Sequence, residues 1–202
     1  MQAAAPLYHP YSPQRRFHDA GARYRERLFM AGNQLGKSLA GAEEVAAHLT
    51  GQYPDWWAGR RWMEPTRWWV ASDTAETTRD SAQRLLVGPP FDERAWGSAA
   101  LPREALKSWH RGRAAGALTA LSVAHASGGL SGVVFKSYDQ GRARWQGETL
   151  DGLWFDEEPP LDIYIEGLTR TNATGGFALV TFTPLKGMSD VVRRFLADAD
   201  RA

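Results

Sequence analysis

Cysteine is absent from the 202-residue chain, so disulfides and thiolate metal sites are excluded. The five histidines do not fall into a His-Glu-x-x-His pattern or a similar cluster, so a zinc centre is not expected. Without cysteine, the sequence places no constraint on the redox compartment.

Long apolar runs are missing as well, because none reaches the roughly 20 residues needed to cross a bilayer. Residues 1–13 lack the basic segment followed by a hydrophobic one that marks an export signal. We therefore expect a soluble cytosolic protein with no membrane partner. The formal net charge is only +1, so any contact with nucleic acid must come from local basic patches.

The apolar segments that are present predict alternating strands and helices. Core strands are expected over residues 28–31, 68–71, 153–156 and 177–182, and helices over residues 37–48, 74–86 (or from 72), 163–168 and 189–199. Residues 118–124 and 133–138 are typical of a hairpin with its glycine-rich turn at 128–132. This order favours one α/β domain with a mostly parallel sheet that has helices on both faces.

The segment AGNQLGKS at residues 31–38 joins an expected strand to an expected helix, which is the context of a phosphate-binding P-loop. In that motif, backbone N–H groups at Gly36 and the helix N-terminus cradle a phosphate, Lys37 binds the β- and γ-phosphates, and Ser38 binds Mg²⁺. The usual motif begins with glycine, whereas here Ala31 comes first and Gly32 follows. A loop that only starts a helix would explain the glycine and serine. However, a lysine in the first helical turn is unfavourable without an anion.

We therefore expect this predicted nucleotide site to bind ATP. Its expected nucleotide-binding residues are Gln14, Gly32, Asn33, Gln34, Leu35, Gly36, Lys37, Ser38 and Leu39. The segment Tyr8 to Gln14 could place an aromatic ring and an amide against adenine, since glutamine offers a donor and an acceptor together. A plain N-terminal arm is an equally good interpretation.

Acidic residues follow the strand at residues 153–156, where Asp156, Glu157 and Glu158 are consecutive. Ligands bind at this end of a parallel sheet. We expect Asp156 to hold Mg²⁺ directly or through water, and Glu157 to orient and deprotonate the water that attacks the γ-phosphate. A solvated acidic turn after a strand is the alternative, which the upstream P-loop makes weaker.

An arginine that faces the γ-phosphate is the third part that such enzymes use, and Arg142 and Arg144 are the candidates, with Arg142 assigned to the catalytic set. Either could instead be a solvated loop arginine. Thr181 and Thr183 end the last core strand, where a hydroxyl could sense the phosphate and couple its state to the next helix. A strand stopped by Pro184 is the competing explanation.

Two basic stretches could contact DNA. Residues 56–62 combine tryptophans with arginines, and Lys107, His110, Arg111 and Arg113 form a second cluster. Arginines can hold phosphates and indoles can stack on unpaired bases. Packing is the favoured interpretation of the first stretch, and a solvated surface that of the second.

Taken together, these residues resemble the large terminase of tailed bacteriophages, the motor that packages DNA into a preformed capsid. The resemblance covers nearly the whole chain. It is carried by Pro13-Gln14 with Phe17-His18, by the AGNQLGKS loop, by Tyr53-Pro54-Asp55-Trp56-Trp57 with Gly59, by WFDEEP at residues 154–159, and by TFTP at residues 181–184.

The resemblance implies an additional-strand, RecA-like P-loop ATPase that translocates double-stranded DNA into a procapsid. It implies Gln14 near adenine, Thr183 in a coupling motif, and an arginine finger supplied in cis or by a neighbour. The implied partners are DNA, the portal protein, the small terminase subunit and further copies in a ring, with five subunits expected, in the cytoplasm of the infected bacterial host.

The expected layout is a single ATPase domain over residues 1–202, with an adenine-side arm at 1–26, a core at 27–202, and no C-terminal nuclease domain in this chain. One competing interpretation is another P-loop motor such as a helicase, which would be expected to show a second RecA-like domain or its arginine motifs. Another is a DNA-binding or assembly module that has lost hydrolysis, against which Lys37, Ser38, Asp156 and Glu157 together argue.

Overall fold

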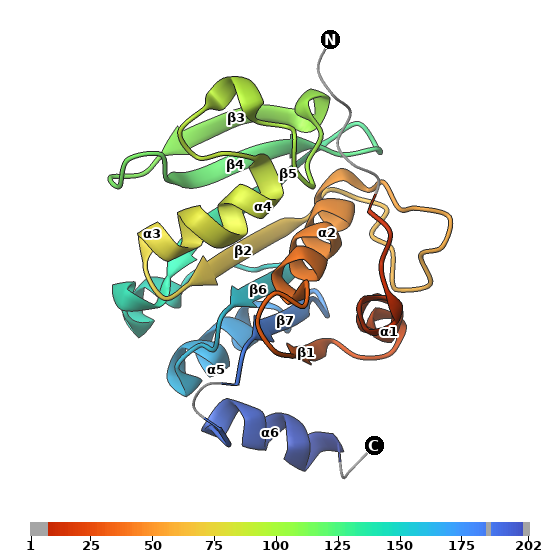
Figure 1. The fold of residues 1–202 in the computed structure, drawn as a ribbon, viewed down its shortest axis with the longest axis vertical. Coiled ribbons are helices and arrows are strands. Elements are labelled where there is room, and N and C mark those ends of the chain that lie inside the picture. Colours follow the sequence, from red (N-terminus) through yellow and green to blue (C-terminus); the bar gives the residue numbers. More distant parts are fainter. Residues whose placement is uncertain (1–7, 185–186, 200–202) are drawn as a thin grey trace.

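A seven-stranded sheet forms the centre of the molecule, as shown by a computed structural model that describes residues 8–184 and 187–199 (Figure 1). The strand order is β1-β7-β6-β2-β5-β4-β3. In chain order the strands are β1 Glu26–Met30, β2 Arg67–Ser72, β3 Leu106–Arg111, β4 Leu118–Ala124, β5 Leu130–Ser137, β6 Gly152–Asp156 and β7 Phe177–Phe182.

Neighbouring strands in the series β1, β7, β6, β2 and β5 pair in parallel. Strand β4 pairs antiparallel with β5, and β3 pairs antiparallel with β4 at the edge of the sheet. Strands β6 and β7 are buried at every residue, as expected for central strands covered on both faces. The expected fold class, an α/β P-loop domain with a mostly parallel sheet, is confirmed.

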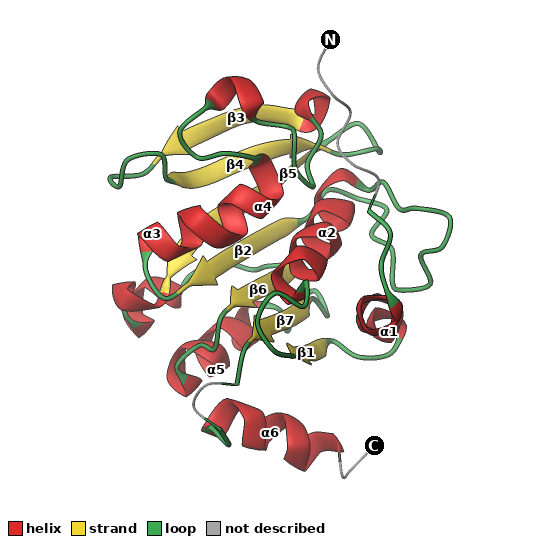
Figure 2. Ribbon diagram, viewed as in Figure 1, coloured by secondary structure: helices red, strands yellow, loops and turns green. Residues whose placement is uncertain are grey.

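Helices cover both faces of the sheet (Figure 2). Their bounds are α1 Ser12–Asp19, α2 Lys37–Thr50, α3 Ala75–Thr78, α4 Arg84–Val87, α5 Leu161–Arg170 and α6 Asp190–Ala199. Helices α2 and α4 share one core cluster, while α5 and α6 pack in a second cluster on the other face. No helix in the described part of the chain has the length and apolar character to cross a bilayer.

Close contact between α2 and the sheet depends on a glycine. A Cβ at Gly41 would lie 2.5 Å from the indole of Trp154, which is fully buried on β6. The absence of a side chain therefore lets α2 approach the central strand, and this approach sets the position of the P-loop at the start of the helix.

Several features differ from the expected elements. The hairpin expected from residues 118–124 and 133–138 is present as β4 and β5, but its turn covers residues 125–129, because Leu130, Ser131 and Gly132, which were expected in the turn, already pair with β4. Strand β3 was not predicted, because it is an outer strand with a single buried residue, Leu106, and therefore lacks an alternating pattern. The helix expected over residues 74–86 is present and is capped by Thr74, but its middle, Arg79–Gln83, is π-helical. Such a turn often marks a functional site.

Candidate active site

The loop between β1 and α2 has the backbone shape that a phosphate cradle requires. Gln34 and Gly36 have left-handed φ angles of 59° and 70°. Gly36 is the N-cap of α2, so no side chain covers the first amides of the helix, and a Cβ there would lie 2.6 Å from the Gln14 amide nitrogen. The free amides and the helix dipole favour an anion at this position.

Lys37 is buried and lies folded back over the loop. Its Nζ donates to the carbonyl oxygen of Gly32 at 3.2 Å and to Thr183 Oγ1 at 2.8 Å. Thr183 in turn donates to Asn33 Oδ1 at 2.9 Å. The residue expected to couple the site to the next helix thus contacts the loop and its lysine, and its coupling role remains a prediction.

Asp156 ends β6 and is almost completely buried. Its Oδ1 accepts a hydrogen bond from Thr181 Oγ1 at 3.0 Å, and its Oδ2 accepts one from Ser81 Oγ. Burial raises the pKa of Asp156, while hydrogen bonds from Ser38, Ser81 and Thr181 and the charge of Lys37 act in the opposite direction. The P-loop serine and the strand carboxylate are therefore adjacent, as a shared Mg²⁺ would require.

Thr181 is oriented by a second contact, because its Oγ1 accepts a hydrogen bond from Trp154 Nε1 at 2.8 Å. Its hydroxyl proton is thereby directed to Asp156. The hydroxyl expected to sense the γ-phosphate donates its hydrogen bond to Asp156, and its role in sensing the nucleotide stays a prediction.

Glu157 has a left-handed backbone with φ of 76°, which is uncommon for a residue other than glycine. Its N–H donates to the Thr181 carbonyl at 2.8 Å, and the Tyr138 hydroxyl donates to its carbonyl, also at 2.8 Å. These contacts stabilise a conformation that costs of order 1 kcal/mol or more. The left-handed backbone at Glu157 ends the extended path of β6, whose last residue is Asp156.

The carboxylate of Glu157 suits a general base. Burial raises its pKa, the charges of Asp156 and Asp73 raise it further, and Lys37 and the backbone N–H of Thr183 lower it. A base works best when its pKa approaches the operating pH. Burial and nearby acidic charge also raise the pKa of Tyr138, so its phenol keeps the proton that it donates.

The arm before β1 contacts the P-loop directly. Gln14 Nε2 donates to the Gly36 carbonyl at 2.8 Å, Gln14 Oε1 accepts from the Tyr11 N–H at 3.2 Å, and the Tyr11 hydroxyl donates to the Leu35 carbonyl. The structure thus places Gln14 beside the predicted nucleotide site. Its contact with adenine remains a prediction. Leu35 and Leu39 are exposed beside the loop.

The two candidate arginines lie in the segment before β6. Arg142 forms an ion pair with Glu166 on α5 at 3.0 Å, and Glu166 also accepts from Arg170 at 3.2 Å. Arg144 is exposed and lines a cavity of about 660 Å³ with Lys136 and other residues. The role of Arg142 as a finger stays a prediction, and reaching a phosphate would require it to leave Glu166.

Sequence reasoning missed Ser81 and Tyr138. Ser81 reaches Asp156 from the π-helical turn, and Tyr138 follows β5. Nothing in the local sequence distinguishes either residue from ordinary polar and core positions. By contrast, the 56–62 stretch is used for packing, since Trp57 is buried and Arg60 lies 3.9 Å above the Trp62 ring and donates to the Gly175 carbonyl.

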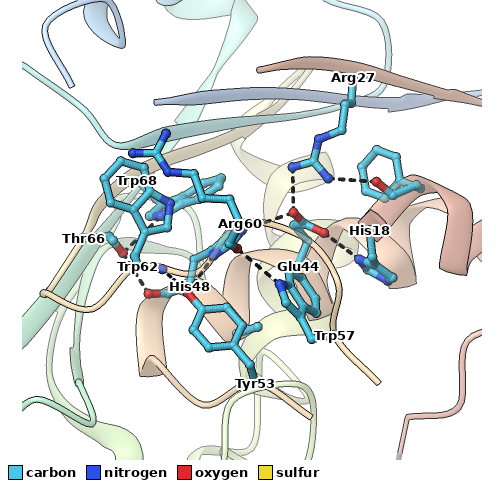
Figure 3. Close-up of polar contacts among 12 residues, drawn as sticks. His18, Arg27, Glu44, His48, Tyr53, Trp57, Arg60, Trp62, Thr66 and Trp68 are labelled. Carbon is cyan, nitrogen blue, oxygen red and sulfur yellow. Dashed lines mark hydrogen bonds and ion pairs between the residues drawn. The ribbon is translucent and has the colours of Figure 1, made fainter. Parts of the chain in front are cut away.

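A buried ionic network supports α2 behind the P-loop (Figure 3). Glu44 accepts from His18 on α1 at 2.5 Å, from Arg27 on β1 at 2.6 Å and from His48 at 3.1 Å. Burial alone would raise the pKa of Glu44, but Arg27 and the two histidine contacts hold it well below its ordinary value. The network thereby fixes α1, β1 and α2 relative to one another.

The donors around Asp156 fit a hard cation. Ser38 and Asp156 both offer oxygen, which Mg²⁺ prefers, and Mg²⁺ usually completes its shell with water and substrate phosphates. Among residues 8–184 and 187–199, no cluster of three or more His, Asp or Glu side chains is placed to hold a metal. The chain's own residues would therefore supply only part of the shell.

Known proteins of one family match this chain. A family model described as "Terminase large subunit, T4likevirus-type, N-terminal" matches residues 28–201. The large terminase subunit of Salmonella phage P22 is 49% identical over 211 residues, covering 96% of this chain and 42% of that protein. The large terminase subunit of Enterobacteria phage LP7 is 28% identical, covering 96% and 44%. The chain thus spans less than half the length of these relatives.

Solved structures share the fold. The large terminase of a thermophilic bacteriophage superposes with a TM-score of 0.65 at 14% identity, covering 96% of this chain and 44% of that one. A second structure of that protein, in complex with ADP, has a TM-score of 0.59 at 15% identity, covering 95% and 43%.

Proposed function

The chain belongs to the T4likevirus-type terminase large subunit family and matches the model of its N-terminal part. From this premise we propose that the chain is a Mg²⁺-dependent ATPase. One observation carries the proposal. The P-loop residues Lys37 and Ser38 and the acids Asp156 and Glu157 converge where β1 and β6 end, through contacts that span more than 100 residues of sequence.

In this proposal the P-loop amides and Lys37 bind the phosphates of ATP. Ser38 and Asp156 would hold Mg²⁺, which supplies charge stabilisation to the phosphate oxygens when bound. Glu157 would accept the proton of the attacking water, and its fixed backbone would keep its carboxylate in place. Lys37 would leave Thr183 to contact the γ-phosphate, so the Thr183 oxygen would lose its donor while its hydroxyl still donates to Asn33, and this change would give Thr183 a part in coupling.

Replacing Glu157 with Gln tests the assignment. We expect ATP binding to stay nearly intact while turnover falls by about 10²–10⁴-fold, because the base is lost but the phosphate contacts remain. The matched control is Glu158→Gln, which removes the next acid of the same turn and should leave turnover within a few-fold of the parent. Unchanged turnover in Glu157→Gln would refute the catalytic role.

We further propose that hydrolysis powers translocation of double-stranded DNA into a procapsid, with the portal protein, the small terminase subunit and further copies in a ring as partners, in the cytoplasm of the bacterial host. In this layout residues 27–202 are the ATPase core and residues 1–26 the arm on the adenine side. Residues 1–7, 185–186 and 200–202 lie outside the described part. A separate nuclease region would belong to the remaining length that the relatives have.

Support for DNA contact comes from the cavity of about 660 Å³, which is lined by Arg79, Arg113, Lys136 and Arg144 and by one acid, Asp139. Such a surface can hold phosphates. DNA-stimulated ATP turnover that weakens steeply with salt would support the motor, and turnover indifferent to DNA would count against it. Absence of turnover would favour a DNA-binding or assembly module that has lost hydrolysis. Unwinding of duplex DNA would favour a helicase.

A further inference from the structure

A small cavity lies beside α2, and neither the P-loop nor Asp156 and Glu157 line it. It has a volume of about 120 Å³ and lies between one side of α2, the loop at residues 52–57 and the segment at residues 100–102. Three aromatic side chains, Tyr8, Trp56 and Trp57, form part of its wall together with one carboxylate, Glu43. We refer to it as the Glu43 pocket.

The carboxylate in this pocket has no partner in the described part of the chain, where neither a hydrogen bond nor an ion pair reaches Glu43. The next residue, Glu44, shows the usual arrangement, since it is buried with three bonded partners. Glu43 is partly buried, and even partial burial of a carboxylate without a partner is unfavourable, because the lost hydration is not replaced. A positive group in the Glu43 pocket would replace it.

The aromatic wall is suited to that group and is held in place. The Trp56 ring centroid lies 6.1 Å from that of Tyr8 and 5.8 Å from that of Trp57. Tyr8 is fixed by a 3.0 Å hydrogen bond between its hydroxyl and His18. The Arg15 guanidinium lies 4.9 Å from the Trp56 centroid, so this indole already binds one cation within the protein.

We propose that the Glu43 pocket receives a lysine or arginine side chain that a protein partner presents. The cationic head would pair with Glu43 while the rings of Trp56 and Tyr8 contact its charge and its methylene groups. The volume of about 120 Å³ suits the end of one side chain and not a folded segment, so the pocket would anchor a larger interface. This role is separate from the ATPase site and does not depend on it.

The test uses short peptides as probes. Acetyl-Gly-Arg-Gly-amide carries the cation, and acetyl-Gly-citrulline-Gly-amide has nearly the same shape without the charge. Binding is followed by the indole N–H resonance of Trp56 in two-dimensional NMR, assigned with Trp56→Phe. We expect saturable binding of the arginine peptide, at least about tenfold tighter than that of the citrulline peptide, equivalent to about 1.4 kcal/mol.

The variant Glu43→Gln keeps the shape of the pocket and removes its charge, so it should abolish the preference for arginine. Asp55→Asn is the matched control, because Asp55 is an exposed acid of the adjacent loop and should leave the preference unchanged. The proposal is overturned if neither peptide binds, if both bind equally, or if Glu43→Gln retains the preference. An equivalent lysine peptide then shows which of the two cations fits better.

Discussion

At neutral and higher pH, the charged Glu43 should lower the free energy of unfolding of the free chain. Removing this charge should therefore raise the free energy of unfolding at high pH and leave it nearly unchanged at low pH. The perturbation is Glu43→Gln, which keeps the size of the side chain. Burial raises the pKa of Glu43 from its ordinary value of 4.5 to about 7. The folded protein therefore holds a proton on this group at pH values where the unfolded chain has released it.

The sign follows from that difference. Below pH 4.5 the carboxyl is protonated in both states and contributes nothing to the pH dependence, and between pH 4.5 and 7 the folded state binds more protons, so the free energy of unfolding falls. At about 1.4 kcal/mol for each pH unit of that interval, the full penalty is about 3 kcal/mol by pH 8. At pH 5 it is under about 1 kcal/mol.

Urea unfolding of the parent and of Glu43→Gln at pH 5 and pH 8 measures the effect. The amide also loses some hydration, so we expect a gain of about 2 kcal/mol at pH 8, which moves the midpoint by about 1 M. At pH 5 the two proteins should nearly coincide. Asp55→Asn should show no gain at either pH. An equal difference at both pH values would refute the reasoning, because it would show that Glu43 does not titrate between them.

Two further substitutions test the site and its support. Ser81→Ala should raise the Mg²⁺ concentration for half-maximal nucleotide binding by about tenfold or more, because a hydrogen bond to a carboxylate such as Asp156 contributes about 1.5–3 kcal/mol; an unchanged Mg²⁺ titration would contradict it. Gly41→Ala should lower the free energy of unfolding by about 1–3 kcal/mol, because the new Cβ would lie 2.5 Å from Trp154. Gly132→Ala, with open space at its Cβ, should change it by less than about 0.5 kcal/mol, and equal losses in both variants would be inconsistent with the packing argument.

Most of the parallel core could be predicted from the sequence, because its signals are local. Strands β6 and β7 are mostly apolar runs that are buried at every residue. The P-loop between β1 and α2 is recognised from the spacing of its glycine, lysine and serine. The acids after β6 follow because the carboxyl ends of parallel strands share one edge. Each of these inferences needs only neighbouring residues and the period of the element.

The parts that could not be predicted depend on contacts between distant segments. Ser81 reaches Asp156 across 75 positions, and its direction is set by a π-helical turn that no spacing rule indicates. The ion pair between Arg142 and Glu166 joins two separate elements, so the sequence alone did not indicate that Arg142 has a partner. Strand β3 shows one buried residue and carries no periodic pattern.

The contrast between Glu43 and Glu44 shows the same limit within a single helical turn. Two identical side chains, adjacent in α2, differ because one points to His18, Arg27 and His48 and the other to a cavity walled by Tyr8 and Trp56. Glu44 holds three elements together and its charge has partners. Glu43 lowers the stability of the fold, and no contact within the described part of the chain explains its presence. Perturbed carboxyls of the second kind cluster at functional sites. If the peptide binds at the pocket, the same substitution that stabilises the free chain should weaken its complex, and measuring both on Glu43→Gln separates a binding role from a packing defect.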